Sequence, residues 1–135
     1  MSGQRNLRTL HVLPTSATPE FIFKPEGNLK IQGRWMRFFD QDYSMNIIKW
    51  LDSYSHHPAE ITSIDINLEY FNNFCSPALV AIIQKCNNVI LKNKKLVINW
   101  YYEEGDEDIL EKGNYFSSHL GLRFNFVMLP VYLEA

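Results

Sequence analysis

The sequence predicts a two-layer α/β domain, with a mixed sheet of about six strands and helices mainly on one face. Residues 64–70 alternate apolar and polar side chains with a period of two, which is typical of a strand with one buried face. Residues 41–54 and 79–90 instead repeat apolar side chains at helical spacing. A strand buried on both faces would be apolar throughout. One face of the sheet is therefore expected to be partly open to solvent.

Three strands are expected near the N-terminus. Residues 10–13 form a short apolar run that is followed by a turn-rich stretch. Residues 21–23 and 29–31 flank a Pro-then-Gly turn, which is typical of a β-hairpin. Gly33 is expected to end this hairpin.

After the hairpin, helices and strands alternate along the chain. Gly121 is well placed to end the last helix, since glycine readily takes the left-handed conformation that follows many helices. Strands linked by helices in this way predict right-handed crossovers within a mixed sheet. The expected elements are a helix at 41–54, a strand at 64–70, a helix at 79–90, a strand at 96–102, a helix at 106–120 and a strand at 124–128.

Length and charge limit the classes of function. The chain has 135 residues, which favours a single domain, expected at residues 10–135 behind a flexible N-terminal tail at residues 1–9. The formal net charge is -2 at pH 7, so no basic surplus predicts binding to nucleic acid. The basic cluster at residues 92–95 is interpreted as a solvated turn after a helix.

Targeting and cysteine patterns favour a cytoplasmic protein. The polar N-terminus lacks the apolar core of a secretion signal. The longest apolar run near the centre, residues 78–83, is far shorter than the ~20 residues of a membrane-spanning helix. Cys75 and Cys86 have no CxxC spacing, so neither a disulfide framework nor a zinc site is expected. No cofactor and no membrane insertion are expected, and the sequence leaves the oligomeric state open.

A series of short motifs, in order and with matching spacing, links the chain to one family. The motifs are Thr18-Pro19-Glu20, Ile31-Gln32-Gly33-Arg34, Trp50-Leu51, Leu68-Glu69-Tyr70-Phe71-Asn72, Trp100-Tyr101-Tyr102-Glu103-Glu104 and Asp106-Glu107-Asp108. From about residue 10 to residue 129 the chain resembles the SiaC-type regulatory phosphoproteins. Their fold is similar to that of the STAS domains of anti-sigma-factor antagonists.

The resemblance implies a signalling adaptor with no catalytic residues. Family members are phosphorylated by a partner serine/threonine kinase on a threonine that directly follows the equivalent of Asn72, and a PP2C-like phosphatase removes the phosphate. The unphosphorylated form binds and activates a diguanylate cyclase, and so controls cyclic di-GMP and biofilm formation. By this resemblance, the residues expected to contact protein partners are Asn72, Asn73, Phe74, Ser76, Tyr102 and Glu103.

The sequence departs from the family at the phosphorylated position. That position holds Asn73, whose amide cannot carry a phosphate ester, so a permanently unphosphorylated-like state is one interpretation. The side chain of Asn73 is interpreted about equally well as a turn residue or as a contact to a partner. Ser76 is an alternative acceptor, but a serine followed by proline also suits the N-cap of a helix, and that interpretation is favoured. A degenerate interaction or structural homologue without any phosphorylation cycle is the second hypothesis for function.

Three further features have competing interpretations. Residues 35–39 are rich in aromatic side chains where the family has a different segment, and they either pack over the core or form an exposed contact patch. The acidic residues between positions 103 and 111 are interpreted as a solvated helix start rather than a metal site. Cys75 is interpreted as a buried thiol rather than a nucleophile. A small enzyme or ligand-binding domain is thus the least favoured hypothesis.

One face of the central strands is expected to be polar. Asn99 and Tyr101 should share it with Asp65, Asn67 and Glu69, because side chains two residues apart on a strand point the same way. That face is either a partner surface or simply the solvated side of the sheet.

Overall fold

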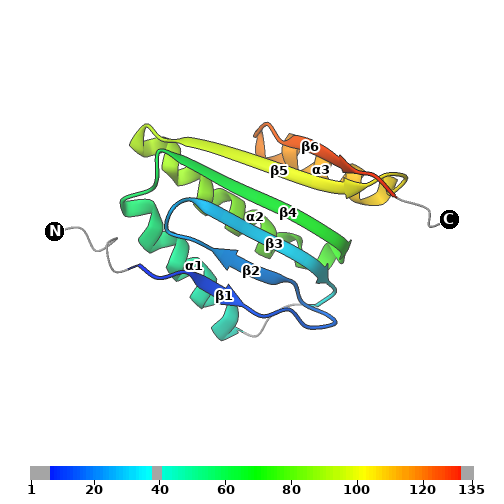
Figure 1. Ribbon diagram of the computed structural model, residues 1–135, viewed down its shortest axis with the longest axis horizontal. Coiled ribbons are helices and arrows are strands. Elements are labelled where there is room, and N and C mark those ends of the chain that lie inside the picture. Colours follow the sequence, from blue (N-terminus) through cyan, green and yellow to red (C-terminus); the bar gives the residue numbers. More distant parts are fainter. Residues whose placement is uncertain (1–6, 38–40, 132–135) are drawn as a thin grey trace.

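The computed structural model describes residues 7–37 and 41–131. Within those ranges the chain forms one six-stranded sheet with its helices on one face (Figure 1). This architecture confirms the predicted α/β fold and the predicted order of strands and helices. The elements are β1 (Leu10–Val12), β2 (Glu20–Phe23), β3 (Asn28–Trp35), α1 (Gln41–His56), β4 (Ile61–Phe71), the 3-10 helix η2 (Asn73–Cys75), α2 (Ser76–Asn87), the 3-10 helix η3 (Asn88–Lys92), β5 (Lys95–Glu103), α3 (Glu107–Leu120) and β6 (Asn125–Leu129).

The order of the strands in the sheet follows the chain from β1 to β6. β1, β2 and β3 pair antiparallel, whereas β3, β4, β5 and β6 pair in parallel. Ile64 lies beside Leu29 and Ile98, and all three side chains are buried under the helices. Asp65, one residue on, lies beside Asn99 on the opposite face. The predicted period of two in this strand therefore identified its buried face correctly.

A β-bulge changes that alternation at the end of β4. The pairing register between β3 and β4 shifts between Gly33 and Arg34, so that β4 contains one extra residue. Beyond the shift Phe71 is buried and Tyr70 is exposed, the reverse of what strict alternation predicts. The prediction that Gly33 ends the hairpin is also wrong. Gly33 takes a φ of 118° at the bulge, and β3 then continues to Trp35.

Trp35 resolves part of the question about residues 35–39. Its side chain is fully buried, and its ring meets the rings of Phe21 and Phe71 edge to face at 5.6 Å. Met36 is exposed, and Phe38 and Phe39 lie outside the described residues. Packing over the core is therefore confirmed for Trp35 alone.

Trp100 of β5 fixes the position of α3. Its indole N–H donates a hydrogen bond to the carbonyl of Ile109, at 2.9 Å, and its ring lies against the ring of Phe124. The helix reaches this close because residue 113 is glycine, where an added Cβ would lie 2.5 Å from the indole nitrogen. A buried aromatic ring and a glycine thus set the distance between α3 and the sheet.

The segment from Asn73 to Lys92 is an apolar helical stretch that lies on the sheet. With 20 residues and a mean hydropathy of 1.3, it is long and apolar enough to cross a bilayer by length and composition alone. Core helices pass the same test, so this is weak evidence for a membrane span. The buried residues of α2 and η3 belong to the same core as the strands, and they are Leu79, Ile82, Ile83, Cys86 and Val89.

The first described residues are attached to the domain. Leu7 packs against the core, and the carbonyl of Arg8 accepts a hydrogen bond from the indole N–H of Trp50 at 2.6 Å. Residues 1–6 of the expected tail lie outside the described residues, so their flexibility stays a prediction.

Candidate partner-binding site

The junction loop, residues 72–76, connects β4 to α2 and is fixed by Asn72. The backbone N–H of Asn72 donates to the carbonyl of Trp35 at 2.8 Å, and its side-chain amide donates to the carbonyl of Met36 at 3.2 Å. Its Oδ1 accepts a hydrogen bond from the N–H of Phe74 at 3.0 Å, and so caps η2. The end of β3, from a distant part of the sequence, therefore positions this loop.

The two residues after Asn72 are exposed. The side chain of Phe74 is 76% exposed, and Asn73 is also open to solvent. Asn73 lies in η2 with no positive φ; Asn93 is the only described residue other than glycine with one. A left-handed turn therefore does not account for an asparagine at position 73.

Ser76 is not the N-cap that the sequence suggested. It is the first residue of α2, with helical dihedral angles of φ -55° and ψ -44°, and Pro77 follows it. Because η2 runs directly into α2, the N–H of Ser76 already bonds to the carbonyl of Asn73. The capping side chain is Asn72, four residues earlier.

Cys75, in the same loop, is a buried thiol, as predicted. Its side chain is inaccessible to solvent, and this burial raises its pKa above the ordinary value. A nucleophilic cysteine needs the opposite shift, because the thiolate is the reactive form. The loop therefore presents no activated thiol.

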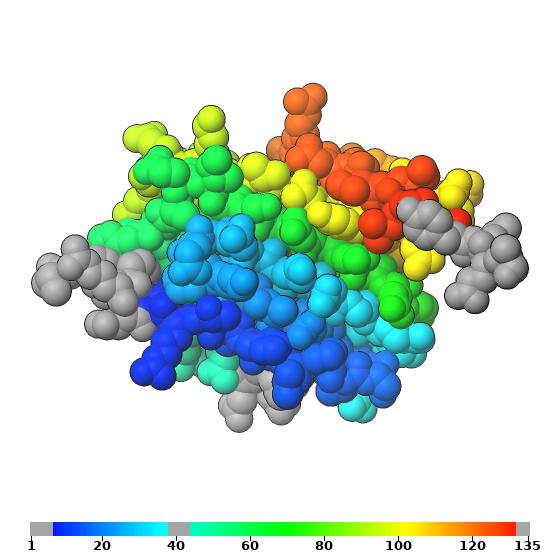
Figure 2. All heavy atoms as spheres, viewed as in Figure 1, coloured from blue at the N-terminus to red at the C-terminus, as the bar shows by residue number. Residues whose placement is uncertain are grey.

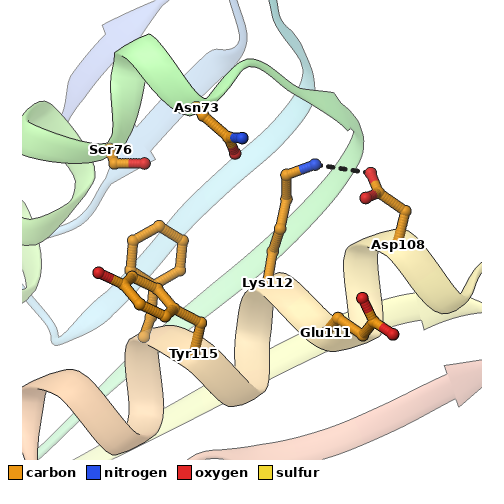
Figure 3. A pocket seen from close by; sticks show the side chains of 7 residues that line it. Asn73, Ser76, Asp108, Glu111, Lys112 and Tyr115 are labelled. Atoms are coloured by element: carbon orange, nitrogen blue, oxygen red, sulfur yellow. Dashed lines mark hydrogen bonds and ion pairs between the residues drawn. The ribbon is translucent and has the colours of Figure 1, made fainter.

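A pocket of about 450 Å³ lies between the junction loop and α3 (Figure 3). Lys112 extends across it, and its Nζ lies 2.6 Å from Oδ2 of Asp108. Two carboxylates and one ammonium group give the lining a formal charge of -1. The lining residues are Asn73 and Ser76 from the loop side and Asp108, Glu111, Lys112, Tyr115 and Phe116 from α3.

The sequence patterns did not predict the α3 side of this pocket. Asp108, Glu111, Lys112 and Tyr115 follow one another at i, i+3, i+4 and i+7, which places them on one face of a helix. That spacing is visible in the sequence, but nothing in it says that this face lies opposite Asn73. Only the packing of α3 beside α2 brings the two together.

Tyr102 and Glu103 lie apart from the junction loop pocket. Tyr102 shares the helix side of the sheet with Trp100 and packs against the core. Glu103 lines a separate groove of about 330 Å³, together with Glu20, Gln32 and Glu69 among others. Four of the six residues expected to contact partners thus lie together in the junction loop, whereas Tyr102 and Glu103 lie on opposite faces of the sheet.

Figure 2 views the molecule from the open face of the sheet, and the expected polar residues lie on this face. The side-chain amide of Asn99 donates to Oδ1 of Asp65 at 2.8 Å, and Asn125 donates to Oδ1 of Asn99 at 3.1 Å. Burial, followed by the negative charge of Asp65, raises the pKa of Tyr101. On the same sheet, hydrogen bonds from His11 and then Gln32 lower the pKa of Glu20.

The acidic run between residues 103 and 111 starts a helix, as predicted. Oδ1 of Asp106 accepts a hydrogen bond from the N–H of Ile109 at 3.1 Å and caps α3. Glu107 and Asp108 occupy the first turn, where the helix dipole favours negative charge. In the part of the chain that the structure describes, no group of three or more His, Cys, Asp or Glu residues could hold a metal ion.

The fold and the exposed, hydrogen-bonded loop define a small α/β domain with an ordered, solvent-exposed junction between β4 and α2. The chain belongs to the SiaC family of regulatory phosphoproteins, whose family model matches residues 12–129. No curated protein matches it.

Two solved structures from Pseudomonas aeruginosa share this fold. One is the crystal structure of the diguanylate cyclase SiaD in complex with its activator SiaC, with a TM-score of 0.75 and 19% identity over 90% of this chain and 99% of that chain. The other is apo-SiaC, with a TM-score of 0.72 and 19% identity over 89% of this chain and 97% of that chain. At this level of identity, the two structures show a common fold.

Proposed function

We propose that this protein is a non-enzymatic adaptor of the cytoplasm that binds and activates a diguanylate cyclase. The observation that carries the proposal is membership of the SiaC family over residues 12–129, because a SiaC with this fold is the activator in complex with SiaD. The docking surface we propose is the junction loop together with the facing side of α3.

The geometry of the junction loop suits a docking surface. Phe74 is a large apolar side chain held outward on a loop that Asn72 fixes from both sides. Aromatic side chains are frequent anchors of protein interfaces. A loop that is already ordered loses less conformational freedom on binding, so more of the contact energy is retained as affinity.

The test uses the diguanylate cyclase of the same host. Phe74→Ala should weaken cyclase binding by about tenfold or more, since truncating a hot-spot anchor costs about 2 kcal/mol or more and a tenfold loss corresponds to about 1.4 kcal/mol. Leu91→Ala is the matched control, because Leu91 is an apolar residue, 82% exposed, at the far end of the same helical segment. Calorimetry measures binding, and cyclic di-GMP production measures activation. Equal affinity of both variants and the parent protein would rule out the loop as the docking surface.

We propose further that the junction loop remains in an unphosphorylated-like state, because position 73 offers no hydroxyl group. Ser76 is half-buried in the same pocket, whose carboxylates oppose a phosphate of roughly -1.5 to -2 charges. Incubation with the host's kinase and intact-mass analysis should show no added phosphate. Asn73→Thr should then gain one phosphate, which the PP2C-like phosphatase removes.

A phosphate on the native chain that disappears in Ser76→Ala would assign the switch to Ser76 and contradict the unphosphorylated-like state. Binding of the cyclase without any phosphorylation of Asn73→Thr would indicate an adaptor that has left the kinase cycle altogether. If affinity capture of this protein from the host recovers no diguanylate cyclase, that result would favour the second hypothesis for function, an interaction or structural homologue without a phosphorylation cycle. The observation that favours this second candidate function, a homologue without a phosphorylation cycle, is that Asn73 has no hydroxyl group.

A further inference from the structure

β6 forms an edge of the sheet, and among the described residues only β5 pairs with it. The opposite edge, β1, has three residues, whereas β6 has five and carries no charged side chain. Natural proteins usually protect an edge strand by short length, charged side chains or proline. β6 has none of these between Asn125 and Leu129.

The backbone of β6 offers hydrogen-bonding groups to a further strand. The carbonyl of Leu129 accepts a hydrogen bond from the N–H of Glu104 at 2.8 Å, so the polar groups of Leu129 point toward β5. Because these groups alternate in direction along a strand, those of Val127 also point toward β5, and those of Phe126 and Met128 point outward. Two N–H groups and two carbonyls are therefore directed away from the sheet.

The side chains of β6 are also incompletely covered. Met128 lies on the helix side of the sheet, in register with Tyr102, yet it is 51% exposed. The cause is the position of α3, which packs mainly against β4, β5 and α2. Val127 lies on the open face beside Tyr101 and is half-buried.

We propose that β6 pairs antiparallel with β6 of a second copy of this chain, about a two-fold axis at Val127. The two six-stranded sheets then join into one continuous sheet. In this register Phe126 lies opposite Met128 of the second copy, so the outward N–H and carbonyl groups bond directly to each other. Val127 lies opposite Val127 of the second copy. These two residues form no hydrogen bonds with each other, because the backbone N–H and carbonyl groups of Val127 point toward β5.

Self-complementarity is what favours a second copy over another partner. No charge in β6 meets a like charge across the axis, and valine opposite valine is a favourable cross-strand pair. Phe126 opposite Met128 adds an aromatic–sulfur contact. A single strand of five residues covers much less than the roughly 800 Å² that each partner buries in a standard interface, so the dimer is weak and depends on concentration.

The dimer is independent of the proposed function and compatible with it. The junction loop lies at the carboxyl end of β4, which runs parallel to β5 and β6. Antiparallel pairing of β6 strands therefore places the two loops at opposite ends of the joined sheet. Each loop stays free to bind a partner.

Cysteine cross-linking of the full chain tests the register. Val127→Cys should form a disulfide-linked dimer under mild oxidation, because opposed residues without hydrogen bonds have Cα atoms about 4.5 Å apart, within disulfide range. Asn125→Cys is the matched control on the same face, since its two copies would be separated by about 13 Å along the strands. A mixture of Asn125→Cys and Leu129→Cys should cross-link, because these two residues lie opposite each other. The native Cys75 and Cys86 are buried and do not compete.

Sedimentation velocity over a range of concentrations gives the second readout. The parent protein should shift from monomer toward dimer as its concentration rises, and Val127→Lys should remain monomeric because two like charges then meet at the axis. Leu13→Lys is the control variant. Leu13 is 69% exposed and directly follows β1, the strand at the other edge of the sheet, so this variant should dimerise like the parent protein. A parent protein that stays monomeric, or Asn125→Cys cross-linking as fast as Val127→Cys, would overturn the proposal.

Discussion

Asn72 and Met36 are 36 residues apart in sequence, and the side-chain amide of Asn72 donates a hydrogen bond to the carbonyl of Met36 at 3.2 Å. The same side chain accepts a hydrogen bond from the N–H of Phe74 through its Oδ1. One residue therefore couples the end of β3 to the start of η2. The junction loop is ordered by the fold itself, before any partner binds.

Asn72→Ala should destabilise the protein by about 1–2 kcal/mol, because it removes a cap and a second hydrogen bond. Asn72→Asp should recover part of this loss, since a carboxylate still accepts the hydrogen bond from Phe74 but cannot donate to Met36. Urea denaturation measures the difference in the free energy of unfolding. Asn73→Ala is the neighbouring control and should change stability by no more than about 0.5 kcal/mol. An equal loss in Asn72→Ala and Asn73→Ala would contradict this account of the loop.

Gly113→Ala should destabilise the protein by about 1–3 kcal/mol, because the new methyl group would lie 2.5 Å from the Trp100 indole nitrogen and force α3 away from β5. The hydrogen bond from Trp100 to Ile109 should weaken at the same time. Thermal unfolding and tryptophan fluorescence report the two effects. Asn114→Ala, at an exposed position of the same helix, should leave stability unchanged or slightly raised, because alanine is the better helix former. A stable Gly113→Ala variant with unchanged fluorescence would show that the sheet tolerates a wider helix spacing.

Lys112→Met should lower the free energy of unfolding by no more than about 0.5 kcal/mol, although it breaks the ion pair with Asp108, one turn earlier on α3. The side chain of Asp108 is 71% exposed, so water already screens most of the attraction. The difference between parent and variant should shrink further as salt is added. Denaturation at low and high ionic strength measures it. A large, salt-independent loss would instead assign Lys112 a structural role in the pocket.

The buried thiol of Cys86 makes the free energy of unfolding depend on pH in the alkaline range. Burial raises its pKa from an ordinary 9.0 to about 12. Between these values the unfolded chain releases the thiol proton and the folded chain keeps it. The contribution of this group to stability is therefore complete below pH 9 and is lost as pH rises toward 12. Cys86→Ala should show a flatter decline over this range in denaturation curves, and an identical decline would contradict the assignment.

The two thiols should also be unreactive in the folded protein. Cys75 and Cys86 are both buried, and burial raises the pKa of each. A thiol reagent such as a disulfide dye at pH 8 should modify neither in buffer and both in denaturant. Fast labelling of Cys75 in the folded state would show that the junction loop opens.

Local patterns predicted those features that depend on neighbours in the sequence. The alternation from residue 64 to residue 68 correctly predicted a strand with one buried face, but it failed at Tyr70, where a bulge exchanges the faces. The Ser76-Pro77 pair predicted a helix start but not the preceding 3-10 turn, which transfers the cap to Asn72. In both places the pairing of β4 with β3 determined the outcome, and no local period encodes that pairing.

The sequence by itself determined the order of the elements, the buried face of β4, the acidic start of α3 and the absence of a hydroxyl group at Asn73. Only the tertiary structure decided what lies around that asparagine. Lys112 and Tyr115 face the junction loop because Gly113 lets α3 pack closely against Trp100. The physical reason is range: periodicity and capping act over a few residues, whereas a pocket forms between elements whose separation is set by side chains far apart in the chain.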